Sequence, residues 1–172
     1  MSADRTFPPG SSPLSRSVPV DRLRQGPDGY TVEATPEECA ALAADFGLPA
    51  IHALSGHFRA DGPTTRLVVT GTVEARITQT CSVTLEPFET EVSEPVEVAF
   101  TDTDRLAGTD AEDEDVPDPI VGGRIDLGAL TAEFLALGLD PYPRKPGVAF
   151  EPHEEAAEKP LAALHRLKGR EG

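Results

Sequence analysis

Alternation between apolar and polar residues dominates the middle of the chain. Apolar residues recur at every second position over residues 67–77, which predicts a long, half-buried antiparallel strand. A second alternating run over residues 88–100 predicts the returning strand, with Pro95 interrupting its ladder. The two runs are separated by a short connection, so a hairpin is the simplest topology. We expect Gly71 to mark a bend or bulge.

A helical period replaces the alternation on both sides of this hairpin. Thr35, Pro36 and Glu38 form the signature of a capping box, and Gly47 suits the left-handed residue that ends a helix. The apolar face between these signals contains Cys39, Leu42, Ala43 and Phe46. Cys39 is therefore most simply a buried small hydrophobe.

The clearest predicted helix follows Asp126, which is a good N-cap residue. Its apolar positions are Leu127, Leu130, Phe134 and Leu137. Three prolines between residues 141 and 146 forbid its continuation and predict an extended exit.

The remaining segments predict a single α+β domain over residues 15–150, an antiparallel sheet built on a long hairpin and packed with two amphipathic helices. Residues 16–23 and 30–34 suggest two short strands that form a hairpin. Residues 1–14 suggest a flexible lead-in, and residues 151–172 a tail with a possible short helix at 160–168.

Charge is distributed unevenly along the chain, whose formal net charge is -15. Between Glu86 and Asp118 there are 13 acidic residues against Arg105 alone. Residues 101–119 are predicted to form an acidic flexible loop, while a nucleic-acid mimic or a cation site stays open as an alternative. The remaining residues are nearly balanced, so the charge excludes a broad polyanion binder but permits a local patch that contacts RNA.

Candidate chemistry is sparse. The four histidines lie in unrelated contexts, and no nucleophile elbow or phosphate-binding glycine loop is present. His52 and His57 could share zinc with a cysteine, but Thr84 stands where a Cys-x-x-Cys knuckle needs its second thiol. We therefore expect no catalytic residues, no metal, no cofactor and no small-molecule substrate. Because no long apolar run or leader is evident, we expect a cytoplasmic protein without a membrane association.

Two motifs resemble the YceD family of large ribosomal RNA subunit accumulation proteins, over about residues 15–150. The motif residues are Gln79, Cys81, Leu85, Glu86 and Pro87 in the first, and Asp126, Leu127, Glu133, Leu137, Asp140, Pro141, Tyr142 and Pro143 in the second. Many relatives carry C-x-R-C-L at the first motif, whereas Val83 and Thr84 replace the Arg and second Cys here. The variant looks like the alphaproteobacterial branch.

The resemblance implies a non-catalytic accessory factor for 23S ribosomal RNA accumulation or processing and for large-subunit assembly. Its expected partner is 23S ribosomal RNA or its precursor, contacted directly or indirectly. Candidate phosphate contacts are Arg144, Lys145, Arg22 and Arg24, with Arg66 and Arg76 more simply solvent-facing strand residues, and Tyr142 is a candidate stacking platform. The alternative is an acidic adaptor that docks a basic ribosomal protein without touching RNA.

Overall fold

The computed structural model describes residues 12–26, 28–102 and 117–148, and its elements form an α+β fold. In chain order they are β1 (Ser17–Pro19), α1 (Val20–Gln25), β2 (Tyr30–Glu33), α2 (Pro36–Phe46), β3 (Ala50–Asp61), β4 (Leu67–Thr80), β5 (Pro87–Asp102), β6 (Asp118–Ile120), β7 (Arg124–Asp126) and α3 (Leu127–Gly138). The main sheet has the order β2-β3-β4-β5-β6, and only its β5–β6 pair is parallel. A separate antiparallel pair joins β1 to β7.

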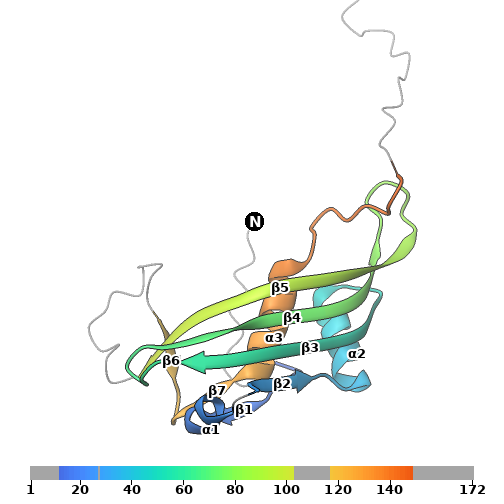
Figure 1. The fold of residues 1–172 in the computed structure, drawn as a ribbon. Helices are drawn as coiled ribbons and strands as arrows, with labels where there is room; N and C mark the ends of the chain where they lie inside the picture. The colour runs from blue at the N-terminus through green and yellow to red at the C-terminus, as the bar shows by residue number, and fades with distance from the viewer. Residues whose placement is uncertain (1–11, 27, 103–116, 149–172) are drawn as a thin grey trace, which may run out of the picture.

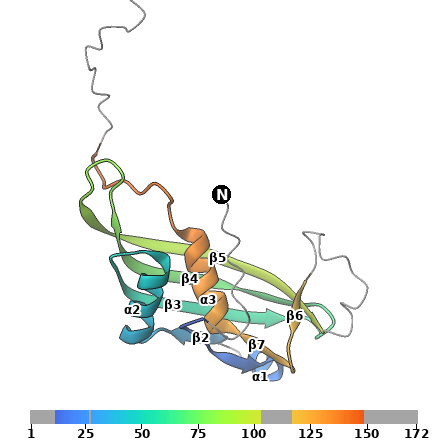
Figure 2. The ribbon, with the colours of Figure 1, turned by 180° about the vertical axis from the view of Figure 1, so that it is seen from behind.

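The helices cover one face of the main sheet and leave the other open. Figure 1 views the open face, and Figure 2 shows α2 and α3 lying across the covered face. Phe58, Leu67, Val73 and Ile77 point into the core between the sheet and the helices. The strand side chains therefore divide as the period of two predicts, with apolar residues toward the helices and polar residues toward solvent.

The long hairpin of β4 and β5 is confirmed. Its register runs from Leu67 opposite Phe100 to Thr80 opposite Pro87. The expected break at Pro95 is wrong, because Pro95 lies opposite Thr72 in an uninterrupted ladder. Proline is accommodated there because β5 is an edge strand over most of its length, so the missing N–H can face away from β4.

Gly71 has a different role from the expected bulge. The β3–β4 register passes through Phe58 and Gly71 without a shift, and the irregularity lies instead between Ile51 and Ala53. A Cβ atom at Gly71 would stand 1.9 Å from the carbonyl oxygen of His57. Glycine is needed because the backbone of β3 lies against this position.

The segment 16–23 is also corrected. Only Ser17–Pro19 is a strand, Val20–Gln25 is a helix, and β1 pairs with β7 while β2 pairs with β3, so no hairpin forms here. Val20 and Leu23 are three positions apart and both buried, as on one face of a helix. Their burial outweighed the alternation that predicted a strand. Leu14, expected in the lead-in, is buried in the core as well.

Both larger helices begin where their caps predict. Thr35 and Glu38 form the reciprocal capping box of α2, Gly47 ends it in the left-handed conformation, and Asp126 caps α3. Cys39 is buried as expected. Leu137, however, is exposed, because the buried stripe of α3 continues from Leu127 through Thr131 and Leu135 with the period of 3.6.

The predicted acidic loop is shorter than residues 101–119, because β5 extends to Asp102 and β6 begins at Asp118. Most of that loop, the rest of the lead-in and the predicted helix at 160–168 lie outside the described residues. No helix in the described ranges is long and apolar enough to cross a membrane.

Candidate nucleic-acid interface at the hairpin tip

The turn between β4 and β5 is held by its own backbone. Cys81 N–H donates to the carbonyl of Glu86 at 2.9 Å, and Leu85 N–H donates to the carbonyl of Cys81 at 2.9 Å. Leu85 has a φ of 60°, the left-handed region that costs a side-chain-bearing residue about 1–2 kcal/mol. Its side chain is nonetheless 76% exposed. The turn thus presents a leucine to solvent in a strained conformation.

The proline-rich exit from α3 docks on this turn, although some 60 residues separate them in sequence. Ser82 N–H donates to the carbonyl of Pro143 at 2.8 Å. Lys145 donates twice, from its N–H to Cys81 Sγ at 3.4 Å and from its ammonium to Glu86 at 3.1 Å. Gln79 Nε2 also donates to the carbonyl of Asp140 at 3.4 Å. The structure therefore brings the first family motif and the last part of the second, residues 140–143, together at one end of the molecule (Figure 1).

Cys81 is the buried centre of this junction. Its side chain exposes no surface, and the pKa of its thiol is lowered to about 6, chiefly by the Lys145 N–H. The hydroxyl and N–H of Thr84 and the N–H of Val83 lower the pKa further, while burial opposes them. The lowered pKa of Cys81 favours its thiolate form at neutral pH, with Thr84 among the groups that hydrogen-bond to it.

The outer side of the junction combines apolar, aromatic and cationic groups. We call Leu85, Tyr142, Arg144 and Lys145 the tip surface, because all four are exposed around the docked exit. Tyr142 is 73% exposed, and its N–H donates to the Asp140 carboxylate, which fixes the backbone but leaves the ring in solvent. An exposed ring close in sequence to a guanidinium and an ammonium is a combination that binds single-stranded nucleic acid, although the Lys145 ammonium also pairs with Glu86.

The four candidate phosphate contacts do not form one surface. Arg144 and Lys145 lie at the tip, whereas Arg22 and Arg24 lie on α1, and Arg24 borders a surface hollow together with Ala60, Asp61 and Gly62. That hollow lies at the opposite end of β4, whose 14 residues span about 45 Å at ~3.3 Å per residue. The basic residues therefore form two separate groups.

The open face of the sheet is predominantly acidic. Its alternating positions carry two arginines, Arg59 and Arg76, against six carboxylates, which are Glu33, Asp61, Glu74, Glu89, Glu91 and Glu97. Such a face repels phosphate. Any RNA contact in the described part of the chain is thus favoured at the tip and disfavoured along the sheet.

The two histidines that the structure describes, His52 and His57, lie apart from the cysteines. His52 Nε2 lies 2.8 Å from the Thr78 hydroxyl, and His57 Nδ1 lies 3.1 Å from the Thr31 hydroxyl. Cys39 lies on α2, and burial raises the pKa of its thiol. Within residues 12–26, 28–102 and 117–148, no group of three or more His, Cys, Asp or Glu residues could hold a metal ion.

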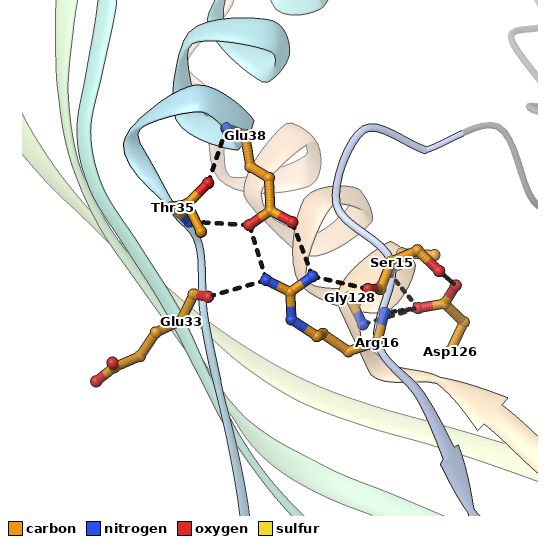
Figure 3. Close-up of polar contacts among 8 residues, drawn as sticks. Ser15, Arg16, Glu33, Thr35, Glu38, Asp126 and Gly128 are labelled. Carbon is orange, nitrogen blue, oxygen red and sulfur yellow. Dashed lines mark hydrogen bonds and ion pairs between the residues drawn. The ribbon is translucent and has the colours of Figure 1, made fainter.

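A polar network that the sequence pattern did not reveal holds the base of α3 (Figure 3). The Arg16 guanidinium binds both carboxylate oxygens of Glu38, at 2.7 and 2.8 Å, while Glu38 also completes the cap with Thr35. The Arg16 N–H donates to Asp126 at 2.7 Å. This network joins the N-terminal segment to the starts of α2 and α3, and α3 leads directly to the docked exit. Arg16 and Glu38 are 22 residues apart in the sequence, so no short-range sequence signal indicated that they would pair.

The motif residue Glu133 lies apart from the tip, on α3 and near Asp118 at the start of β6. Burial raises the pKa of Glu133 on α3, and the nearby Asp118 carboxylate raises it further. Burial also raises the pKa of Asp118. Asp118 begins β6 and Glu133 lies in the middle of α3, so neither carboxylate belongs to the tip surface.

The fold and the tip define a small α+β protein whose long hairpin carries the exit of its last helix. The family model described as "Large ribosomal RNA subunit accumulation protein YceD" matches residues 69–168, more than half of the 172-residue chain. The chain therefore belongs to the YceD family, whose description links its members to the accumulation of large-subunit ribosomal RNA. No curated protein and no solved structure matches it.

Proposed function

We propose that this protein is a non-catalytic accessory factor for the accumulation or processing of 23S ribosomal RNA and for large-subunit assembly, and that it touches RNA through the tip surface. Family membership supports the ribosomal role. The observation that carries the RNA contact is the tip itself, where Tyr142, Arg144 and Lys145 are held in solvent by a docked backbone. The ring would stack on an unpaired base, and the two cations would contact the flanking phosphates.

Salt-dependent binding of the full chain to fragments of 23S ribosomal RNA tests this contact. The variant Arg144→Ala with Lys145→Ala removes two candidate phosphate contacts, so the slope of log affinity against log salt falls by about 1.4 for single-stranded RNA. Arg22→Ala with Arg24→Ala is the matched control, because it removes the same charge at the far end of the molecule. Equal losses in the two variants, or no binding by the wild type, would contradict direct contact at the tip.

Tyr142 gives a second, charge-independent readout. Tyr142→Ala is expected to weaken binding by about 1–3 kcal/mol per stacked base, while Tyr142→Phe retains the ring and the affinity. Because the ring is exposed, neither change should lower the thermal stability. An unchanged affinity in Tyr142→Ala would remove the stacking step.

The proposal that the protein is non-catalytic rests on the buried position of Cys81, the free cysteine at the tip. Its thiolate is enclosed by the turn and the docked exit, so it is available for holding this junction rather than for attacking a substrate. Cys81→Ser should therefore support normal levels of 23S ribosomal RNA in cells that lack the wild-type protein. Loss of function in a folded Cys81→Ser protein would point to thiol chemistry.

A second candidate function is an acidic adaptor that docks a basic ribosomal protein, with RNA contact indirect. The excess of carboxylates over Arg59 and Arg76 on the open sheet face favours it. Binding of the purified chain to a basic ribosomal protein, with no binding to 23S fragments, would select this candidate over the first.

A further inference from the structure

The outer edge of β5 carries a row of unpaired backbone groups. β5 pairs with β4 from Pro87 to Phe100, but β6 pairs with it only from Phe100 to Asp102. Between Pro87 and Ala99 this edge has no backbone partner in the described part of the chain. A long open edge is a template for a further strand.

Pro95 shows which backbone groups face outward. Proline cannot donate to an antiparallel ladder, so Pro95 must occupy a pair whose backbone groups point away from β4. Every second residue shares that orientation. Glu89, Glu91 and Ser93 therefore direct their N–H and C=O groups into solvent, and Pro95 ends this row. We call residues 88–94 the β5 edge.

The docked exit leaves the β5 edge uncovered. Its hydrogen bonds reach Gln79, Cys81, Ser82 and Glu86, all in β4 or in the tip turn. Glu89, Glu91 and Ser93 are exposed, and the residues between them are only half-buried. A sixth strand can thus pair with these residues, which are open to solvent.

Charge selects the occupant. Among the described residues, Glu91 and Glu94 have no ion-pair partner, and Glu89 has only His52 at 3.8 Å, which is charged only when protonated. A second copy of this chain would bring another row of glutamates against the first, which opposes pairing of two β5 strands. A basic strand would instead place its cations beside these carboxylates.

We propose that the β5 edge binds an extended, basic polypeptide segment by strand addition. Alternate residues of that segment lie on the open face beside Glu89 and Glu91, where lysine or arginine fits. The residues between them lie on the covered side beside Phe88 and Val92, where apolar side chains fit. The inference deepens the second candidate function by giving it a site and a mode of binding, and it rests on that function for its partner class.

The test uses the full chain and a peptide of about seven residues, alternating lysine and valine, which spans the β5 edge at ~3.3 Å per residue. Binding should protect the amides of Glu89, Glu91 and Ser93 from hydrogen exchange. The same peptide with every backbone amide methylated keeps its charge but loses its strand donors, so it should not bind. Equal binding of the two peptides would overturn strand addition and leave only nonspecific attraction.

Protein variants locate the site. Ser93→Pro removes an outward N–H without removing a donor to β4, and Glu89→Lys with Glu91→Lys reverses the edge charge; each should weaken peptide binding by about tenfold. Glu33→Lys with Asp61→Lys is the matched control, because it makes the same charge change on the open face away from the edge, on β2 and at the far end of β3. A similar loss in the control would overturn the assignment, as would protection of the three amides in the unliganded chain, which would mean that the edge is already occupied.

The outcome is separable from the fate of the proposed function. Cells carrying Ser93→Pro as their only copy are examined for 23S ribosomal RNA. If the peptide does not bind but the level of 23S ribosomal RNA still depends on the protein, the strand-addition site is overturned and the proposed function is not. Protection of the β5 edge by 23S fragments instead of the peptide would also overturn it, because the occupant would then be RNA.

Discussion

Removal of the Arg16 side chain probes the network at the base of α3. Arg16→Ala deletes two charge-assisted hydrogen bonds to Glu38 and the guanidinium's hydrogen bonds to the carbonyls of Ser15 and Glu33. It leaves the Arg16 N–H on Asp126 and the Arg16 carbonyl on Leu127 N–H. Hydrogen bonds to charged groups contribute about 1.5–3 kcal/mol when buried, and exposed ion pairs below about 1 kcal/mol. The Arg16 and Glu38 side chains are 32% and 20% exposed, so a loss of about 2 kcal/mol is expected.

Thermal and urea unfolding of the full chain measure this loss. For a chain of this size, about 2 kcal/mol corresponds to a decrease of about 4–8 °C in Tm. A double-mutant cycle with Glu38→Gln should give a coupling free energy of about 1–2 kcal/mol. Arg22→Ala on the exposed side of α1 is the control and should change stability by less than about 0.5 kcal/mol. A coupling below about 0.5 kcal/mol would refute the network's role.

The same pair predicts a pH dependence with a definite sign. The hydrogen bond from Arg16 is the main cause of the lowered pKa of Glu38. A carboxyl whose folded pKa is lowered stabilises the fold above its ordinary pKa, about 4.3, and loses that contribution as pH falls through the lowered value. The stability difference between wild type and Arg16→Ala should therefore be constant near neutral pH and shrink in acid. A constant difference down to strongly acidic pH would contradict the assignment.

Three further predictions follow from single residues. Gly71→Ala places a Cβ against the His57 carbonyl and should destabilise the fold by about 3 kcal/mol in urea unfolding, whereas a change below about 1 kcal/mol would mean that β3 and β4 separate easily. Leu85→Gly relieves a left-handed φ and should leave Tm unchanged or raised, and a clear decrease would contradict the strain. Thr84→Val should raise the pKa of Cys81 from about 6, as measured by thiolate absorbance with Cys81→Ser as the blank. The wild type should also be more stable than Cys81→Ser by an amount that grows between about pH 6 and the ordinary thiol pKa of about 8.5. A stability difference that does not change with pH would argue against a thiolate.

Local sequence signals predicted the elements whose determinants are local. The alternation in β4 and β5, the capping box at Thr35 and Glu38, and the N-cap at Asp126 each depend on residues a few positions apart. The prediction failed where tertiary packing decided between two short-range patterns, as at Val20 and Leu23, which are buried on a helix. The prediction at Pro95 was wrong because a proline interrupts a ladder only where its missing N–H would face a paired strand. Whether β5 has a neighbour on that side is a property of the sheet.

The site was only partly predictable for a related reason. Family motifs indicated residues around Cys81 and Tyr142, but periodicity gave no reason to bring them together. Their contact depends on the direction in which the chain leaves α3. It also depends on hydrogen bonds between distant segments, such as the one from Ser82 N–H to the Pro143 carbonyl. Docking of the exit on the turn places Arg144 and Lys145 at the tip, far from Arg22 and Arg24 on α1. The sequence alone could not reveal this separation.

The most direct test of the central claim measures 23S ribosomal RNA and large-subunit particles in cells whose only copy of this protein carries Tyr142→Ala, Arg144→Ala and Lys145→Ala. The account predicts that this folded variant lowers 23S ribosomal RNA and large-subunit particles to the level of cells lacking the protein, while Arg22→Ala with Arg24→Ala restores both. Normal large-subunit particles in the tip variant would contradict the assignment of function to the hairpin tip.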